Sequence, residues 1–369
     1  MNAFTYYNPV TIRFGTGTLA EINRWVGNRR VLLVTTAGFI KRGILDQLGS
    51  LTGQIAGVLD QIPPNPTFVA LRDLYATAWE KEFDVIVALG GGSVMDGAKA
   101  LSVYDDSHQF DIVEGIIRGT RAKSGYKLKP MIAIPTTAGT GSELTPWATV
   151  WDMEEKKKYS LHLPNLWAEA CICDPELTLS LPRDITVQTS LDALSQALEA
   201  IWNKNANPIS TRYAITAARE IMTTLPLLAD DLPNLELRTR QMWGSLNTAL
   251  AFSNTQTAVA HAISYYVTAQ KGTPHGIACS FTLPDIIDTM AGVHSEVDFA
   301  LNAIFGAQGG DAVRNLLKLL RVSTHPADYG LSKKDLSLIR QSLTGNIRAG
   351  NSLVPVEPLF DRLEKHLVA

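Results

Sequence analysis

The chain has 369 residues, and at roughly 150 residues per domain this length predicts two or three domains. Its 33 Lys and Arg residues nearly balance 36 Asp and Glu residues, so no basic stripe points to nucleic acid and no acidic tail points to disorder. The three cysteines, Cys171, Cys173 and Cys279, are too few for a disulfide framework and suit a reducing compartment. The N-terminal residues show no signal-peptide pattern, so we expect a cytoplasmic globular protein.

The first half of the chain alternates short apolar runs with amphipathic stretches. In chain order the pattern predicts a strand over 30–35, a helix over 41–48, a turn over 63–66, a helix over 67–81, a strand over 84–89, a helix over 95–103 and a strand over 129–135. Cys171 and Cys173 also lie in an apolar run and are interpreted as buried thiols. Apolar strands separated by helices are typical of a parallel sheet that is covered on both faces.

The second half has helical periodicity almost throughout. The predicted helices cover 192–203, 210–223, 235–252, 257–268, 311–320, 333–344 and 355–367. One stretch, Gln241–Gln270, contains no Asp, Glu, Lys or Arg, but 13 of its 30 residues are Ser, Thr, Asn, Gln or His, which hydrocarbon would penalise. We therefore expect a buried helix or a broken pair of helices there, and no membrane span. The change in pattern predicts an α/β domain over 1–181 and an all-helical domain over 182–369, with a ligand bound between them.

Two glycine-rich turns each follow a predicted strand. Gly90–Ser93 opens a helix, and three glycines let the backbone approach an anion that the helix N-terminus can hold. Pro135–Glu143 is again rich in Gly and hydroxyl side chains. The first turn matches neither the GxGxxG fingerprint nor a P-loop, and alone it is equally well read as a tight turn. The two turns together favour a nucleotide ligand.

Four polar residues of the helical half have the spacing of metal ligands. Asp192 and Gln196 are four residues apart on one helix face, and His261 and His275 follow in the uncharged region and just after it. A carboxylate and imidazoles in apolar surroundings suit a divalent metal. Spacing alone favours the plainer interpretation, in which His261 is a core residue and His275 a loop residue.

Several segments resemble the iron-containing (group III) alcohol dehydrogenases over nearly the whole chain. They are Tyr6–Pro9, Phe14–Gly15, Pro64–Thr67, Gly90–Lys99, Ile134–Glu143, Asp174–Pro175, Asp192–Leu194, His261 and Pro274–Gly276. The resemblance implies a Rossmann-like α/β domain of the dehydroquinate synthase-like superfamily, followed by a helical domain. Segments 201–208, 251–254 and 276–284 look like the branch of this family that reduces phosphonoacetaldehyde to 2-hydroxyethylphosphonate.

The resemblance also implies roles for individual residues. Gly91, Gly92 and Ser93 would hold the diphosphate of NADPH or NADH, with Asp96 near the nicotinamide. The adenosine and ribose side would be lined by Thr136, Thr137, Thr140 and Ser142. Asp192, His261 and His275 match three of the family's four ligands to Fe²⁺ or Zn²⁺, and His275 would also take part in a proton relay.

The chain departs from the family pattern at three positions. Gln196 stands where the family has a histidine ligand, so three outcomes stay open: a metal held with help from the Gln196 carbonyl, a metal-free reductase, or a non-catalytic nucleotide-binding protein. Tyr265 replaces a further histidine near the substrate and is expected either to relay a proton or to pack. Thr36 replaces an acidic residue that would bind the ribose 2′-hydroxyl, which mildly favours NADPH.

The expected substrate is a small aldehyde or alcohol, with a phosphonate as the favoured case. The alternative function is that of a general short-chain alcohol dehydrogenase. Cations for a phosphonate are sought at Lys204, Arg212 and Lys271, although the sequence favours an ordinary solvated side chain at each of them. Lys158 is expected on a surface hairpin. The resemblance further implies a homodimer that pairs through residues 4–14.

Overall fold

The protein is described from a computed structural model, which covers residues 3–155 and 157–367. These residues form two compact units. The first, here named the α/β unit, comprises Pro9–Thr137 and Ser142–Thr178. The second, the helical unit, comprises Ala138–Gly141 and the described parts of Met1–Asn8 and Leu179–Ala369. The predicted fold class, a parallel α/β sheet followed by a helical region, is confirmed.

The α/β unit is built on a six-stranded parallel sheet with the order β1-β10-β7-β4-β2-β3. Its strands are β1 (Thr11–Phe14), β2 (Val31–Val34), β3 (Ile55–Leu59), β4 (Val85–Gly90), β7 (Met131–Pro135) and β10 (Ala170–Cys173). The four inner strands are buried along their whole length, which explains why they read as continuous apolar runs. Cys171 and Cys173 lie buried in β10, as predicted.

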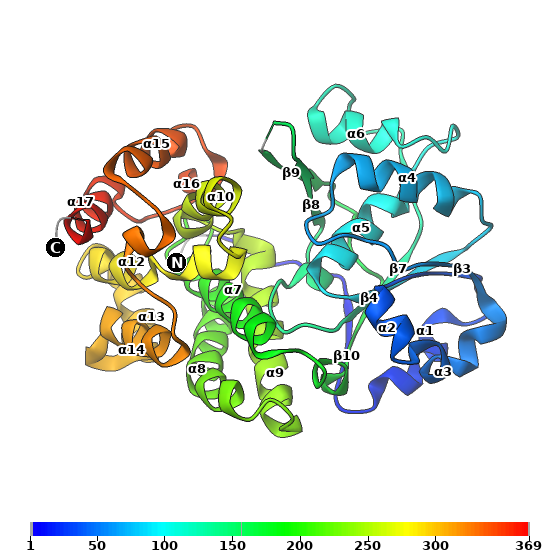
Figure 1. The fold of residues 1–369 in the computed structure, drawn as a ribbon, viewed down its shortest axis with the longest axis horizontal. Coiled ribbons are helices and arrows are strands. Elements are labelled where there is room, and N and C mark those ends of the chain that lie inside the picture. Colours follow the sequence, from blue (N-terminus) through cyan, green and yellow to red (C-terminus); the bar gives the residue numbers. More distant parts are fainter. Residues whose placement is uncertain (1–2, 156, 368–369) are drawn as a thin grey trace. The chain divides into compact units, whose positions relative to one another are not determined.

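Helices cover both faces of this sheet, as Figure 1 shows. On one face lie α1 (Asn23–Val26), α2 (Ala37–Lys41) and α3 (Ile44–Gln47), and on the other lie α4 (Phe68–Trp79) and α5 (Gly92–Ser102). The first face encloses a core that runs from Leu19 through Val31, Val87 and Ile134 to Ile172. The prediction of one continuous helix over 41–48 is wrong. Gly43 adopts a left-handed φ of 77° and separates α2 from α3.

Short antiparallel pairs complete the α/β unit. One joins β5 (Val103–Tyr104) to β6 (Lys127–Leu128), and α6 (Asp111–Arg118) lies between them in the chain. The other is a hairpin of β8 (Trp147–Asp152) and β9 (Lys157–His162). Lys158 lies on β9, so the prediction of a hairpin there is confirmed.

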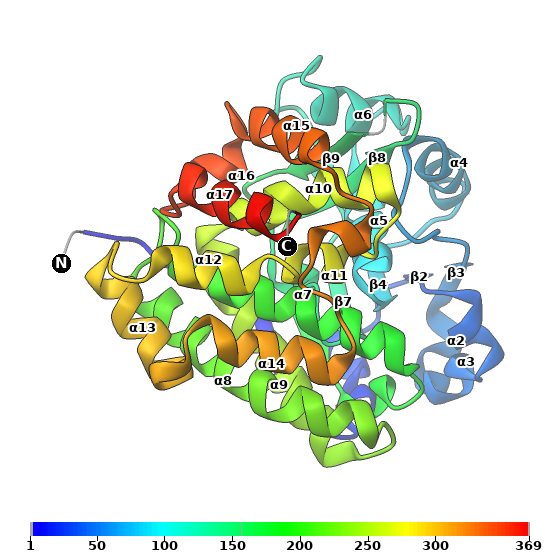
Figure 2. The ribbon, with the colours of Figure 1, turned by 60° about the vertical axis from the view of Figure 1, so that its left-hand side comes forward.

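The helical unit is organised around α7 (Arg183–Ile201), which packs against α8 (Pro208–Asp230) and α9 (Leu235–Thr255). Figure 2 shows these three helices together with the later ones that surround them. The later helices are α10 (Val259–Lys271), α11 (His275–Ser280), α12 (Leu283–Met290), α13 (Ser295–Phe305), α14 (Gly310–Leu320), α15 (Lys333–Leu343), α16 (Ile347–Gly350) and α17 (Val356–His366). Every residue of α7 from Ser190 to Ile201 is buried, so its polar side chains must find partners inside the protein.

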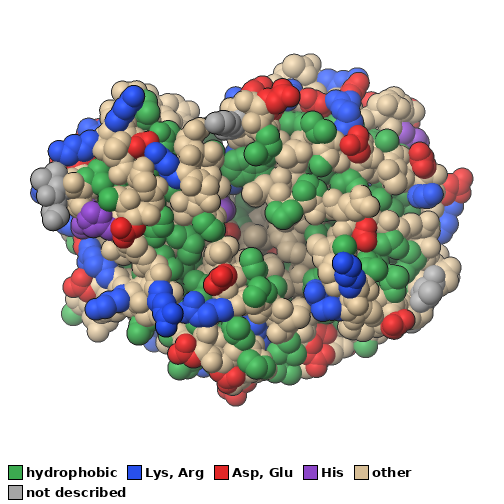
Figure 3. All heavy atoms as spheres, in the orientation of Figure 1, with side chains coloured by type: hydrophobic (Ala, Val, Ile, Leu, Met, Phe, Trp, Pro, Cys, Tyr) green, Lys and Arg blue, Asp and Glu red, His purple; other side chains and the backbone are tan. Residues whose placement is uncertain are grey.

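The uncharged stretch Gln241–Gln270 forms a broken pair of buried helices, as expected. The break lies at Gln256, whose φ of 65° ends α9 before α10 begins at Val259. Among the described helices, none is both long and apolar enough to cross a membrane. Acidic and basic side chains are interspersed on the face drawn in Figure 3, in keeping with the net charge of −3.

Candidate metal and cofactor sites

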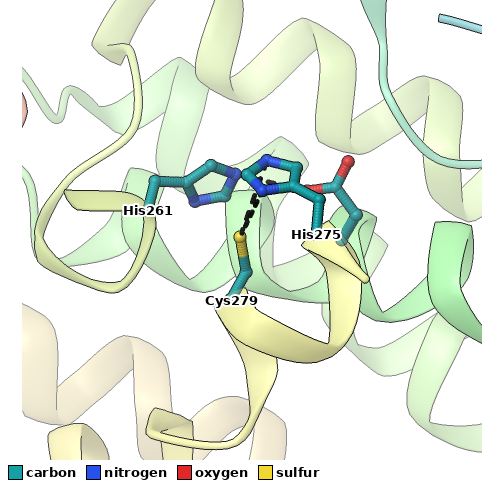
Figure 4. A group of neighbouring side chains, drawn as sticks. His261, His275 and Cys279 are labelled. Carbon is teal, nitrogen blue, oxygen red and sulfur yellow. Dashed lines mark hydrogen bonds and ion pairs between the residues drawn. The ribbon is translucent and has the colours of Figure 1, made fainter. Parts of the chain in front are cut away.

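Four side chains of the helical unit bring potential metal-ligand atoms together. They are Asp192 of α7, His261 of α10, and His275 and Cys279 of α11, and their ligand atoms all lie within 4.8 Å of one another. Figure 4 shows His261, His275 and Cys279 converging on one point. Three of these residues were predicted as ligands from the sequence, whereas Cys279 was not.

A close approach of α11 to α7 creates this cluster. Gly276 has no side chain, and a Cβ atom there would come within 1.9 Å of the Gln188 carbonyl oxygen of α7. His275 is the first residue of α11, and Cys279 follows four residues later on the same helix face. The interpretation of His275 as a loop residue is therefore wrong: the helix starts at His275 and directs its side chain toward Asp192 and His261.

A buried carboxylate orients His261. Glu199 of α7 has no solvent exposure, and its Oε2 atom lies 2.6 Å from His261 Nδ1, while its Oε1 atom accepts a hydrogen bond from the His261 backbone N–H. This contact holds the Nδ1 proton and directs Nε2 at Asp192 Oδ1, 3.2 Å away. A carboxylate that accepts from a histidine which binds a metal through its other nitrogen is a common arrangement in metal sites.

A hydroxyl group sets the orientation of His275 in a similar way. Ser264 donates its proton to the His261 carbonyl oxygen, and its Oγ atom lies 3.4 Å from His275 Nδ1. Because that hydroxyl proton is already used, Nδ1 of His275 is the donor in this contact, and Nε2 of the ring lies 3.7 Å from Cys279 Sγ. The Tyr265 ring stacks on the His275 ring at a centroid distance of 6.4 Å. Tyr265, which was expected either to relay a proton or to pack, therefore lies beside the cluster.

The electrostatics of the cluster favour a positive charge. Burial lowers the pKa of His261, but Cys279, Glu199 and Asp192 outweigh burial, and the net shift of the pKa is upward. For Cys279, burial raises the pKa and the neighbouring His261 opposes that rise. Two buried carboxylates, Asp192 and Glu199, thus flank the His261 ring, and this local negative charge suits a cation.

Gln196 differs from the four clustered residues in having an unsatisfied atom. It lies one turn after Asp192 on α7, is buried, and donates through Nε2 to the Thr140 carbonyl oxygen at 3.5 Å. Its Oε1 atom is buried and has no hydrogen-bond partner among the described residues. A buried oxygen in this state is costly unless something binds it, and a divalent cation would do so. The donor set and this oxygen thus fit a metal ion.

In the α/β unit, the two predicted glycine-rich turns lie at the carboxyl ends of the neighbouring strands β4 and β7. Gly91 is the N-cap of α5, and Gly92 and Ser93 form its first turn. The turns touch: a Cβ atom at Gly91 would lie 3.3 Å from the Thr137 side chain, and Thr136 donates its backbone N–H to the Gly90 carbonyl oxygen. Such an edge of a parallel sheet, with a helix N-terminus beside it, suits a phosphate group.

A buried polar network holds these turns together. Ser142 donates to Asp96 Oδ1 at 2.7 Å, and the Thr149 backbone N–H donates to Asp96 Oδ2 at 3.0 Å. Lys99 donates to the Ser142 carbonyl oxygen at 2.6 Å and to the Trp147 carbonyl oxygen at 2.7 Å. Both Asp96 and Ser142 were predicted to contact the cofactor, and they also tie α5 to the second turn.

Sequence reasoning gave no role to Lys99 or Glu143, although both belong to the quoted motifs. Burial lowers the pKa of Lys99 to about 8 and raises the pKa of Glu143 to about 7. Charged residues inside otherwise apolar segments were the available signal for both.

The remaining candidates have the following surroundings. Thr36 follows β2 as the half-buried N-cap of α2, and Thr140 belongs to the helical unit rather than to the α/β unit. Lys204 donates to the Gly350 carbonyl oxygen at 2.7 Å, and Lys271 pairs with Asp335 at 2.9 Å. Arg212 is exposed on α8.

Comparison with known proteins identifies the family. Residues 9–175 match the family described as iron-containing alcohol dehydrogenase, and residues 186–352 match the C-terminal domain of the Fe-containing alcohol dehydrogenase family. The chain belongs to the iron-containing alcohol dehydrogenase family, and it is therefore an oxidoreductase of the alcohol dehydrogenase and aldehyde reductase kind.

Three similar proteins carry more specific names. Phosphonoacetaldehyde reductase of Streptomyces viridochromogenes is 34% identical over 65% of this chain, and the match spans 64% of that protein's length. 4-Hydroxybutyrate dehydrogenase of Cupriavidus necator is 30% identical over 77% of this chain and 76% of its own. The structure of sulfoacetaldehyde reductase from Bifidobacterium kashiwanohense in complex with NAD⁺ superimposes with a TM-score of 0.90 at 28% identity, covering 100% of this chain and 99% of that one.

Proposed function

We propose that the protein reduces a small aldehyde bearing an anionic group to the corresponding alcohol, with phosphonoacetaldehyde reduced to 2-hydroxyethylphosphonate as the specific reaction. The main support is the cluster of Asp192, His261 and His275, whose potential ligand atoms lie within 4.8 Å of one another in a protein of this family. The substrate is suggested by two similar proteins, which are named for two-carbon aldehydes that carry a phosphonate or a sulfonate.

Two bound groups would supply the chemistry: a reduced nicotinamide dinucleotide provides hydride, and a divalent Fe²⁺ or Zn²⁺ polarises the carbonyl group. Asp192, His261 and His275 hold the metal, and Gln196 offers its unpartnered Oε1 atom. The N-terminus of α5, with Gly91, Gly92 and Ser93, holds the diphosphate. Asp96, Thr136, Thr137, Thr140 and Ser142 line the rest of the dinucleotide site.

The proton that completes the alcohol is proposed to come through the residues beside the cluster. The Tyr265 ring lies nearly parallel to the His275 ring, with the centroids 6.4 Å apart and an interplanar angle of 15°. His275 in turn is hydrogen-bonded through Nδ1 to Ser264. In this scheme Tyr265 Oη delivers the proton to the new alkoxide, and His275 orients the tyrosine.

The cofactor is proposed to be NADPH in preference to NADH. Thr36, the N-cap of α2 after β2, lies at the place where a carboxylate would repel a 2′-phosphate, and its side chain carries no charge. A Thr36→Asp variant should raise the KM for NADPH and leave the KM for NADH within a factor of about two. Equal effects on both cofactors would contradict the assignment of Thr36.

Binding of the phosphonate is proposed to involve Lys204, Arg212 or Lys271. Of these, Lys204 contacts the Gly350 carbonyl oxygen and Lys271 contacts Asp335, whereas Arg212 is exposed on α8.

We further propose a homodimer that pairs through residues 4–14, which include β1 at the edge of the sheet. A cytoplasmic location is proposed because all three cysteines are free and buried.

A substrate panel tests the proposed reaction. The metal-loaded protein should oxidise NADPH with a higher kcat/KM for phosphonoacetaldehyde than for propanal or glyceraldehyde. A preference for the uncharged aldehydes would indicate a general short-chain alcohol dehydrogenase. No turnover with any short aldehyde would refute the proposed function.

The second candidate is a metal-free reductase of the same superfamily. The observation that favours it is Gln196 in the position of a family histidine, because an amide oxygen binds Fe²⁺ or Zn²⁺ less well than an imidazole does. This candidate predicts that chelation leaves the rate of aldehyde reduction unchanged.

A further inference from the structure

The sulfur atom of Cys279 belongs to the same cluster as the proposed metal ligands. We propose that Cys279 binds the metal as a thiolate and replaces the imidazole that is missing at Gln196. The inference rests on the proposed metal site but concerns its composition: one carboxylate, one thiolate and two imidazoles. Asp192, His261, His275 and Cys279 would form this set.

The distances within the cluster agree with a single tetrahedral ion. A zinc ion with Zn–S of about 2.3 Å and Zn–N or Zn–O of about 2.1 Å places sulfur about 3.6 Å from nitrogen, and nitrogen about 3.4 Å from oxygen. Cys279 Sγ lies 3.7 Å from the ring nitrogens of His275, and His261 Nε2 lies 3.2 Å from Asp192 Oδ1. All four ligand atoms lie within 4.8 Å of one another, so side-chain movements of about 1 Å would close them around one metal.

The setting of Cys279 also favours a ligand over a packing residue. Its side chain is fully buried, and α11 holds it on the same face as His275 (Figure 4). Gly276 keeps this face close to α7, where Asp192 lies. A second, independent observation points to a ligand at this place: the buried Gln196 Oε1 atom, one turn from Asp192, has no partner among the described residues.

A Cys279 thiolate in place of an imidazole changes the charge and the chemical softness of the ligand set. With three imidazoles and one carboxylate, a divalent ion keeps one positive charge; with Asp192 and a Cys279 thiolate, the charge of the ion is fully neutralised. Thiolate ligands favour Zn²⁺ over Fe²⁺. Binding releases the thiol proton to solvent, as metal binding by cysteine requires. The protein should therefore retain Zn²⁺ in preference to Fe²⁺, in contrast to the metal named in its family.

The test replaces the metal by Co²⁺, because a thiolate bound to cobalt gives a near-ultraviolet charge-transfer band that nitrogen and oxygen ligands do not give. Wild-type protein should show this band with one Co²⁺ per chain. Cys279→Ser should lose the band and bind Zn²⁺ more weakly. Loss of an outer-shell partner costs about 10–100-fold in metal affinity, and loss of a ligand should cost more. Cys171→Ser removes another buried thiol, in β10, and should keep both the band and the affinity.

A double variant guards against failure of Cys279→Ser to fold. Cys279→Ala combined with Gln196→His restores the ligand set typical of the family, and it should regain Co²⁺ binding without the charge-transfer band. A wild-type Co²⁺ complex without the band, or Cys279→Ser with unchanged Zn²⁺ affinity, would overturn the inference and leave Gln196 as the fourth ligand. Wild-type protein that binds no metal but reduces aldehydes would overturn the inference while the proposed reaction stands. A cobalt–thiolate band without any aldehyde turnover would refute the reaction alone.

Discussion

At the scale of single residues, the metal cluster depends on side chains that hold the ligands as well as on the ligands. Glu199 contacts His261 twice, through its ring Nδ1 and through its backbone N–H. Both residues are buried, so the contact is shielded from water. Glu199 lies seven residues after Asp192, two turns along the same face of α7, but the sequence alone gives no reason to pair it with a histidine 62 residues later.

Replacing Glu199 by Gln tests this positioning role. The amide keeps the shape of the side chain but cannot accept the Nδ1 proton as a carboxylate does, so the affinity for Zn²⁺ should fall about 10–100-fold. Competition with a chromophoric chelator measures the affinity. Glu220→Gln removes a partly exposed carboxylate paired with Arg240 on the same unit and serves as the control. Affinity of Glu199→Gln within twofold of wild type would show that Glu199 only fills space.

At the scale of elements, the sequence predicted those strands and helices whose burial leaves a clear pattern. The inner strands β2, β4 and β7 are buried on both sides, and α7 to α10 are long, so periodicity was enough to find them. The predicted start of α7 at residue 192 was wrong, because the helix begins at Arg183. The short α11 and α12 were missed, because Gly and Pro punctuate the segment after Gly272 and leave too few residues for a periodic signal. The 11-residue α13 was also missed. The edge strands β1 and β3 were missed because they are partly exposed, so they do not form continuous apolar runs in the sequence.

The packing of α11 on α7 gives a prediction at this scale. Gly276→Ala adds a Cβ atom 1.9 Å from the Gln188 carbonyl oxygen, so α11 must move away from α7 and carry His275 and Cys279 with it. We expect a loss of about 1–3 kcal/mol in the free energy of unfolding, together with weaker Zn²⁺ binding. Gly350→Ala, where a Cβ atom meets nothing within 4 Å, is the matched control. Unchanged metal affinity in Gly276→Ala would mean that the ligands do not depend on this contact.

At the scale of the whole molecule, the buried charges of the α/β unit make stability depend on pH. Burial raises the pKa of Glu143 to about 7, above its usual value of 4.5. The folded protein therefore holds a proton there that the unfolded chain loses, so stability from this group is complete below about pH 4.5 and declines as the pH rises toward 7.

Urea unfolding across this pH range, compared with Glu143→Gln, isolates the effect. The difference in unfolding free energy between wild type and variant should change by roughly 3 kcal/mol between pH 4.5 and 7, because each pKa unit corresponds to about 1.4 kcal/mol. Wild type should be favoured at the acid end. A difference that stays constant with pH would contradict a raised pKa at Glu143.

The candidate site was only partly predictable from the sequence. Asp192, His261 and His275 were found through their resemblance to a family pattern, because spacing alone left His261 and His275 as ordinary core and loop residues. Cys279 and Ser264 had no such signal: a thiol in an apolar run and a serine in a helix acquire a role only when α10, α11 and α7 pack together. Contacts between distant segments carry this information, and no local pattern encodes it.

The central claim is that a divalent metal at Asp192, His261 and His275 promotes aldehyde reduction by this chain. The most direct measurement is the rate of NADPH oxidation with phosphonoacetaldehyde, before chelation, after removal of the metal, and after return of Zn²⁺ or Fe²⁺. The account predicts that the rate falls with the metal content and returns when the metal is restored. A metal-depleted protein that keeps its full rate would contradict it.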